Sequence, residues 1–184
     1  MTEPQIYDPG PANLARAVKD GEQKWTLVLV REMRHSPEKV WEALTDPAQL
    51  REWAPFVTDE SLGAVGTVKL TWVGAPTPID TKVTRVEAPK ALEYGDMRWE
   101  LEASGRGTRL TLWAKIDRRF ISMGAAGWHI SFDVLDHLLS GTPIGRIAGG
   151  DATKFAGWQR LNAEYAKQFG MKAPNWPPQA TQKS

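Results

Sequence analysis

The residues best placed to do chemistry are His129, Asp133 and His137, which recur at intervals of four. In a helix this spacing brings all three side chains to roughly one face. Two imidazoles and a carboxylate could bind a metal ion or transfer protons. However, a closed zinc site takes four ligands, this pattern is common by chance, and no His-Glu-x-x-His motif is present. The spacing therefore favours a solvated or half-buried polar face over a metal site.

The remaining nucleophile and phosphate motifs are incomplete. Ser131 and Ser140 lie near the histidines, but neither occupies a Gly-x-Ser-x-Gly turn. The glycines between Gly145 and Gly150 lack the Lys-Ser/Thr ending of a phosphate-binding loop, so we expect a connector there. The absence of cysteine excludes a thiolate zinc site, a cysteine nucleophile and disulfide bonds. These motifs predict no catalytic residue, metal or cofactor.

Tryptophan is the unusual component, with nine residues in a chain of 184. Each brings a large apolar area and one N–H that needs a partner when buried. Such enrichment fits a core with an internal cavity, a binding surface or dense packing. Otherwise the composition, 41% hydrophobic and 24% charged, is typical of a single globular domain.

The charge balance argues against two classes of partner. The chain has 23 basic and 22 acidic residues, a net charge of +1, whereas nucleic acids and anionic membranes select clustered basic faces. No apolar run approaches the ~20 residues of a spanning helix, and no signal-peptide pattern opens the chain. We expect no nucleic acid partner, no membrane insertion and a cytoplasmic location.

The element that positions the histidines is an amphipathic helix over residues 127–141. Trp128, Phe132, Leu135 and Leu139 follow at spacings of four, three and four, so they share one face, and a glycine is placed to end the helix. This apolar stripe needs a surface to pack on, and a sheet would supply one.

The rest of the pattern supplies that sheet. Alternating apolar and β-branched residues predict strands over 25–33, 66–73, 79–87, 92–94, 98–103 and 108–116. Ser36 and Asp46 are expected to cap two short helices after the first strand, and Asp151 to cap a last helix over 151–169. We therefore expect an irregular N-terminal arm over 1–23, one domain over 24–170 and a loose tail over 171–184.

Four stretches carry a resemblance to a known superfamily: Val30–Pro47 with Leu50 and Trp53, Val83–Tyr94, Trp99–Leu112, and Gly127–His129 with Leu135. In their order and spacing they resemble the START-related, pollen-allergen-like (SRPBCC) superfamily. Within it, the chain is similar to the activator of heat-shock-protein-90 ATPase-like family. The resemblance covers roughly residues 24–141, and the last helix and both ends lie outside it.

The resemblance implies an α+β helix-grip fold. In this fold an antiparallel sheet of about six or seven strands curves around a C-terminal helix, two short helices follow the first strand, and the last helix is additional. Such folds often hold a hydrophobic cavity between sheet and helix, but the fold does not select one function. The leading hypothesis is binding of a small apolar ligand. The alternatives are a cyclase- or hydrolase-like enzyme, with His129 or a strand carboxylate as acid or base, and a co-chaperone or regulatory protein.

The expected ligand-binding residues are those predicted to face the space between sheet and helix. They could equally fill the core, because large side chains can occupy the cavity that they line. We expect a small apolar molecule as partner, do not expect a chaperone partner, and leave a homodimer open. The residues are Trp53, Phe56, Leu70, Trp72, Trp99, Leu101, Leu112, Trp128, His129, Phe132 and Leu135.

Overall fold

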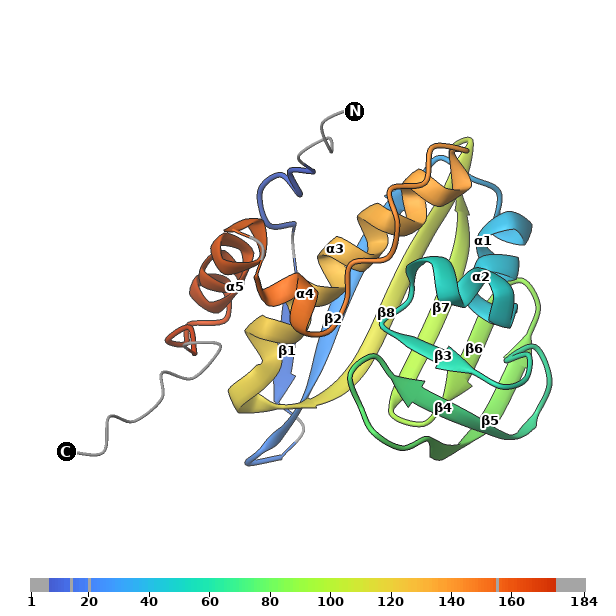
Figure 1. Ribbon diagram of the computed structural model, residues 1–184, viewed down its shortest axis with the longest axis horizontal. Helices are drawn as coiled ribbons and strands as arrows, with labels where there is room; N and C mark the ends of the chain where they lie inside the picture. The colour runs from blue at the N-terminus through green and yellow to red at the C-terminus, as the bar shows by residue number, and fades with distance from the viewer. Residues whose placement is uncertain (1–6, 14, 20, 155, 175–184) are drawn as a thin grey trace.

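The computed structural model describes residues 7–13, 15–19, 21–154 and 156–174. Most of the predicted loose tail and the first part of the N-terminal arm lie outside these residues. The described chain is a curved sheet wrapped around one long helix (Figure 1). The predicted helix-grip fold is therefore confirmed.

The sheet is fully antiparallel, with strand order β1-β2-β8-β7-β6-β5-β4-β3. Each strand from β3 to β7 pairs with the next in sequence, which makes a meander, and β2 pairs with β8. The strands are β1 (Ala15–Lys19), β2 (Lys24–Met33), β3 (Phe56–Thr58), β4 (Gly66–Trp72), β5 (Ile79–Glu87), β6 (Ala91–Tyr94), β7 (Met97–Ser104) and β8 (Gly107–Asp117).

The eight strands exceed the predicted six or seven, because β1 and β3 at the two edges were missed. Residues 15–19 form a strand rather than part of an irregular arm, pairing along β2 with Ala17 opposite Leu27. The β1 stretch is short and half exposed, so its own pattern is weak. Without β1, strand β2 would be the edge of the sheet, with unpaired N–H and C=O groups along that side. Hydrogen bonding to these groups explains why residues 15–19 form a strand.

Two short helices close one end of the sheet, as predicted: α1 (Pro37–Thr45) and α2 (Pro47–Trp53). The Ser36 hydroxyl accepts a hydrogen bond from the Lys39 N–H, and the Asp46 carboxylate accepts one from the Ala48 N–H. Each helix has proline in its first turn, where its missing N–H costs nothing. Both N-caps therefore act as predicted.

The long helix α3 (Ile121–Leu139) lies across the concave face of the sheet (Figure 1). It begins six residues before the predicted start, after a 3₁₀ turn over Arg118–Phe120. Gly124 and Gly127 weaken the helical signal, since glycine costs about 1 kcal/mol in a helix relative to alanine. Tertiary packing overrides this cost, because Ile121 and Ala125 are fully buried and extend the predicted stripe.

The C-terminal region forms two helices where one was predicted: α4 (Gly150–Thr153) and α5 (Ala156–Gln168). Asp151 lies inside the single turn of α4 and does not cap α5. The Thr153 hydroxyl donates to the Gly150 carbonyl, which satisfies that group locally and favours a stop after one turn. Helix α5 packs against α3 on the side away from β3–β6 (Figure 1).

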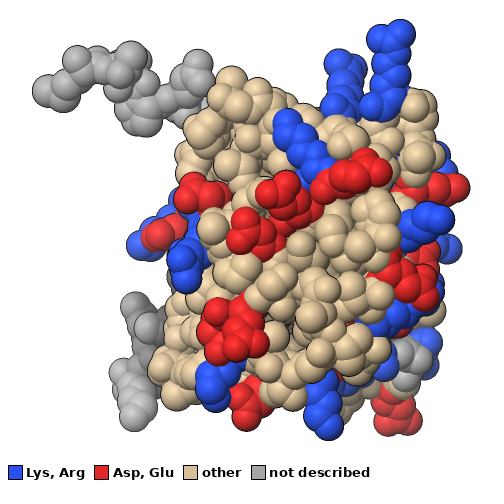
Figure 2. Space-filling model, turned by 90° about the vertical axis from the view of Figure 1, so that its right-hand side faces the viewer, with Lys and Arg blue, Asp and Glu red and all other residues tan. Residues whose placement is uncertain are grey.

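On the face shown in Figure 2, both acidic and basic side chains are present. Across the described ranges, we find no helix long and apolar enough to cross a membrane.

Candidate functional site

Four of the expected ligand-binding residues form an aromatic cluster between α3 and the sheet. The ring centroids of Trp99 and Trp128 lie 5.4 Å apart, those of Trp53 and Trp99 6.3 Å, and those of Trp128 and Phe132 5.9 Å. The Trp53 indole donates to the Ala43 carbonyl at 2.9 Å. These rings occupy space that an open helix-grip cavity would leave free.

The other expected sheet-facing residues extend this packing. Phe56, Leu101, Leu112 and Leu135 are buried, and Phe56 makes an edge contact with Trp72 at 5.3 Å. Tyr94, which the sequence analysis did not include, completes the cluster.

The Tyr94 hydroxyl accepts a hydrogen bond from the Trp99 indole at 3.0 Å. Burial raises the pKa of Tyr94. The buried indole of Trp99 therefore has a partner within the core and needs none from a ligand.

A pocket of about 300 Å³ remains on the concave face, beside the aromatic cluster; we call it the sheet pocket. Of the residues predicted to bind a ligand, Leu70, Trp72 and Trp128 line it, together with residues of β2, β5, β7 and β8. Trp72 is 36% exposed and Ile79 52% exposed, whereas Trp128 is buried. The full lining is Leu27, Leu70, Trp72, Ile79, Thr81, Gly95, Asp96, Met97, Ala114, Lys115, Ile116 and Trp128.

Strand alternation accounts for part of this lining. Ala114 and Ile116 share a face of β8 with Leu112, so period-two reading places them inward. The alternation does not distinguish Ala114, which borders the sheet pocket, from Leu112, which is packed in the core. That difference depends on the strands and helix opposite, which only the assembled sheet brings together.

His129 lies away from the sheet pocket, between the N-terminal segment and α5. Its Nε2 lies 2.8 Å from the Pro9 carbonyl and its Nδ1 2.7 Å from the Tyr165 hydroxyl. A carbonyl only accepts, so Nε2 carries the proton and the Tyr165 hydroxyl donates to Nδ1. The Asn13 N–H donates in turn to the Tyr165 oxygen. Both ring nitrogens are therefore engaged in holding three segments together.

Burial sets the protonation of this network. It lowers the pKa of His129, against the opposing effects of the Pro9 carbonyl and Asp133. Burial also raises the pKa of Tyr165 to about 12. At neutral pH both groups are uncharged, which suits hydrogen bonding within a buried contact.

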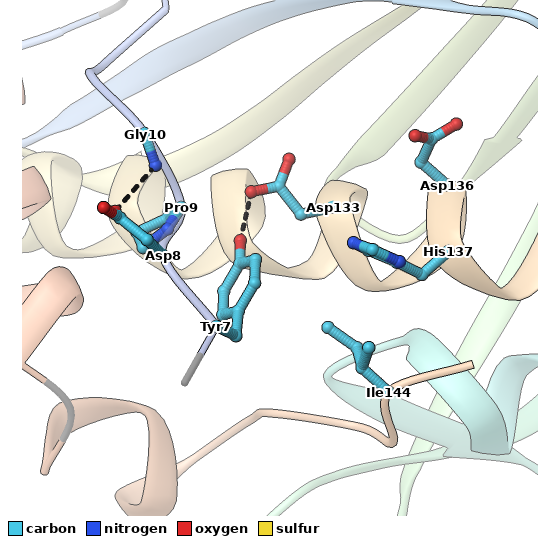
Figure 3. Close-up of a pocket in the computed structure, with 8 residues that line it drawn as sticks. All are labelled: Tyr7, Asp8, Pro9, Gly10, Asp133, Asp136, His137 and Ile144. Carbon is cyan, nitrogen blue, oxygen red and sulfur yellow. Dashed lines mark hydrogen bonds between the residues drawn. The ribbon is translucent and has the colours of Figure 1, made fainter. Parts of the chain in front are cut away.

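Asp133 lies on the same side of α3 and forms an ion pair with Arg31 of β2. It also accepts a hydrogen bond from Tyr7 of the N-terminal segment (Figure 3). The Arg31 and Asp133 side chains are each only 17% exposed. Burial and the hydrogen bond to Asp133 raise the pKa of Tyr7. The ion pair therefore joins β2 to α3, and the hydrogen bond from Tyr7 anchors the N-terminal segment over α3.

A pocket of about 590 Å³ opens along this side of α3, and we call it the N-terminal pocket. Figure 3 shows Asp136 and His137 one turn beyond Asp133, with Ile144 facing them. His35 holds Asp136 at 2.8 Å. Thus the i, i+4, i+8 pattern does not assemble one site: Asp133 and His137 line this pocket, whereas His129 turns to Tyr165. In the described part of the chain, no group of three potential metal ligands is found.

Comparisons with known proteins identify the fold and the family. Among solved structures, a conserved protein of unknown function, EF2215 from Enterococcus faecalis, is 18% identical with a TM-score of 0.61, covering 84% of this chain and 89% of its own. CalU16 from Micromonospora echinospora is 19% identical with a TM-score of 0.58, covering 83% and 92%. MLL2253 from Mesorhizobium loti is 26% identical with a TM-score of 0.55, covering 64% and 98%.

No curated protein matches the chain significantly. A family model described as "Polyketide cyclase / dehydrase and lipid transport" matches residues 24–131. The match runs from β2 through most of α3, which is more than half of the chain and includes both the sheet and the helix that it grips. The chain therefore belongs to the polyketide cyclase/dehydrase and lipid transport family.

Proposed function

We propose that this protein binds a small hydrophobic ligand, lipid-like, aromatic or polyketide-like, in the sheet pocket. The observation that carries the proposal is an apolar pocket on the concave face with exposed Trp72 and Ile79 and buried Trp128. Exposed large apolar side chains at a concavity are typical of a ligand entrance. The description of the family, which joins polyketide chemistry and lipid transport, supports the same class of ligand.

The packing limits the size of the ligand. Small-molecule pockets commonly span about 300–1,000 Å³, so the sheet pocket lies at the small end of that range. Because the rings of Trp99 and Phe132 occupy the space beside Trp128, a ligand cannot extend along α3 without displacing them. We therefore expect a compact ring system or the end of a chain.

Polar recognition in the sheet pocket is sparse. The Thr81 hydroxyl donates to the Ile79 carbonyl, and the exposed Lys115 and Asp96 lie where a ligand's polar end could remain hydrated. Within the described residues, the Trp128 indole N–H makes no hydrogen bond. That N–H is available to donate to a ligand carbonyl or hydroxyl.

The test is titration with the fluorescent apolar amine N-phenylnaphthylamine. Ala114→Phe fills the sheet pocket and should weaken binding about tenfold or more, a loss of about 1.4 kcal/mol. Thr111→Phe is the matched control, because it adds the same ring on the outer face of β8. Equal binding by a folded Ala114→Phe variant, or no saturable binding by the wild type, would contradict the proposal.

Catalysis on such a ligand is the second candidate, favoured by the cyclase and dehydrase activities in the family description. The titratable groups in the described lining are Asp96 and Lys115. Asp96 is 63% exposed and forms an ion pair with Lys24, which suits it poorly to act as a buried acid or base. His129 has both nitrogens engaged elsewhere. The site therefore supports binding better than turnover.

The more specific resemblance to the activator of heat-shock-protein-90 ATPase-like family and a cytoplasmic location remain predictions. A co-chaperone or regulatory role remains an alternative hypothesis, and a homodimer remains open.

A further inference from the structure

A second apolar pocket, of about 410 Å³, lies along the other side of α3; we call it the flank pocket. Gly124, Gly127 and Ser131 of α3 form one wall. Ile147, Ala148 and Trp158 contribute to the wall opposite. This pocket shares Ile116 with the sheet pocket but otherwise has different lining residues.

The outer wall belongs to a part of the chain beyond the family match. Residues 147–158 lie after residue 131, where the match ends. The wall is firmly seated: Ala148, Ala152 and Trp158 are buried, and Gly149 has φ +61°. A Cβ at Gly149 would lie 3.1 Å from the Val73 carbonyl oxygen, so the loop passes directly over the end of β4. The pocket is therefore preformed by packing.

Gly127 is unexplained by the fold alone. It lies inside α3, where glycine costs about 1 kcal/mol relative to alanine. Its conformation is helical, and a Cβ there would meet no atom within 4 Å. By contrast, a Cβ at Gly124 would lie 2.6 Å from the Ile116 Cδ1, so Ile116 would have to shift to admit a side chain there. What Gly127 preserves is open volume in the flank pocket.

Ser131 supplies one polar group to this apolar space. It is 1% exposed, and within the described residues its hydroxyl makes no hydrogen bond. That hydroxyl borders the flank pocket, where a bound molecule can reach it. The Thr153 hydroxyl is already bound to the Gly150 carbonyl. Ser131 is therefore a group that can hydrogen-bond to a molecule in this pocket.

The lining also defines the charge of that molecule. None of the described lining residues is charged. A charged ligand would lose hydration without finding a counter-charge, whereas a neutral one would gain from apolar burial.

From these observations we propose that the flank pocket is a second binding site, for a small, neutral, largely apolar molecule whose one hydrogen-bonding group is held by Ser131. The proposed site does not depend on ligand binding in the sheet pocket. Apart from Ile116 the two pockets have different lining residues, including different tryptophans, so the occupancy of each can be followed separately.

The experiment is fluorine NMR of fluorotryptophan-labelled full-length protein during titration with prodan, a neutral naphthalene ketone. Trp158 reports on the flank pocket, whereas Trp72 and Trp128 report on the sheet pocket. Single Trp→Phe variants assign these resonances. We expect a saturable shift of the Trp158 resonance, with its own midpoint.

Gly127→Leu should weaken the response at Trp158 about tenfold or more while changing the midpoint at Trp72 less than about twofold. Gly127→Ala is the matched control for helix propensity and should retain binding. If Gly127→Leu does not fold, Ala148→Leu fills the pocket from the opposite wall. Ser131→Ala should weaken binding of prodan about fivefold, the loss of one hydrogen bond.

No shift of Trp158 up to the solubility limit of prodan would overturn the second site, as would an unchanged Trp158 response in a folded variant with the pocket filled. A common midpoint for all three resonances that Gly127→Leu and Ala114→Phe both abolish would also overturn it, since one ligand would then span both pockets. If Trp158 responds and Trp72 and Trp128 do not, the second site stands and binding in the sheet pocket fails.

Discussion

The two flanks of α3 are built on opposite principles. On one flank, His129 bonds to the Pro9 carbonyl and Asp133 accepts from Tyr7, and these interactions hold the N-terminal segment in place, while Arg31 of β2 pairs with Asp133. On the other, Gly127 and Ser131 face a hollow that the C-terminal segment covers. One helix thus carries a polar tether beside the N-terminal pocket on one side and the apolar flank pocket on the other.

The difference follows from what each kind of group requires. A buried charge or hydrogen-bonding group must find its partner, so the polar flank is specified atom by atom. Apolar side chains lose only dispersion and burial energy where a neighbour is missing, so the apolar flank can keep a hollow at modest cost. Substitutions on the polar flank should therefore act mainly on stability, and those on the apolar flank mainly on occupancy.

Asp133→Ala should have the largest effect. It leaves the mostly buried guanidinium of Arg31 without this carboxylate, and breaking a buried pair from one side costs about 3 kcal/mol. Urea unfolding measures the loss. Asp136→Ala, one turn later at a side chain 50% exposed, is the control and should cost about 1 kcal/mol or less. Similar losses of unfolding free energy in the two variants would show that Asp133 contributes no more to stability than a half-exposed surface carboxylate.

Acid should weaken the polar flank through His129. Its folded pKa lies below the ordinary value of 6.5, so in mild acid the unfolded chain binds a proton that the native protein does not. Above about pH 6.5 His129 is neutral in both states and does not lower the free energy of unfolding. As the pH falls below this value, the free energy of unfolding decreases by at most about 1.4 kcal/mol per pH unit. Urea unfolding at pH 7.5 and 5.5, values chosen about one unit either side of that midpoint, should show the loss. His129→Gln should reduce the change in the free energy of unfolding between the two pH values. An unchanged difference would show that other groups cause the pH dependence.

The two glycines of the apolar flank should respond differently to alanine. Gly127→Ala enters open space and should stabilise the protein by about 0.5–1 kcal/mol through helix propensity. Gly124→Ala pushes against the terminal methyl of Ile116, which must shift, so it should stabilise the protein less than Gly127→Ala does. Thermal unfolding of both variants compares the two gains. Equal stabilisation by the two variants would show that Ile116 moves aside at no cost.

Ser131→Ala should have the smallest effect on the unliganded protein, within about 0.5 kcal/mol, because the hydroxyl makes no hydrogen bond among the described residues. Unfolding without ligand measures this. A large loss would reveal a structural partner for the hydroxyl and weaken its assignment to a ligand.

Local patterns predicted much of the fold. The caps at Ser36 and Asp46, the alternation of β8 and the stripe from Trp128 to Leu139 depend on neighbours within a few residues, and all appear in the structure. The edge strand β1 and the early start of α3 were missed. Pairing with β2 and burial of Ile121 created them, and neither signal exists in the local sequence.

The candidate site was less predictable than the fold. Of the expected ligand-binding residues, Leu70, Trp72 and Trp128 line the sheet pocket, whereas Trp53 and Trp99 pack into the aromatic cluster. Apolar residues that face a core have the same pattern whether they fill space or border it. The distinction depends on the volumes of side chains far apart in the chain.

The sequence by itself determined the sheet, the gripped helix and the superfamily, because period, capping and order are local or linear properties. Tertiary structure determined which residues each side of α3 contacts. It turned His129 toward the Pro9 carbonyl and Tyr165, 120 and 36 residues away, and it covered Gly127 with a wall from beyond residue 142. Such partners are chosen by packing across the whole chain, where no local pattern records them.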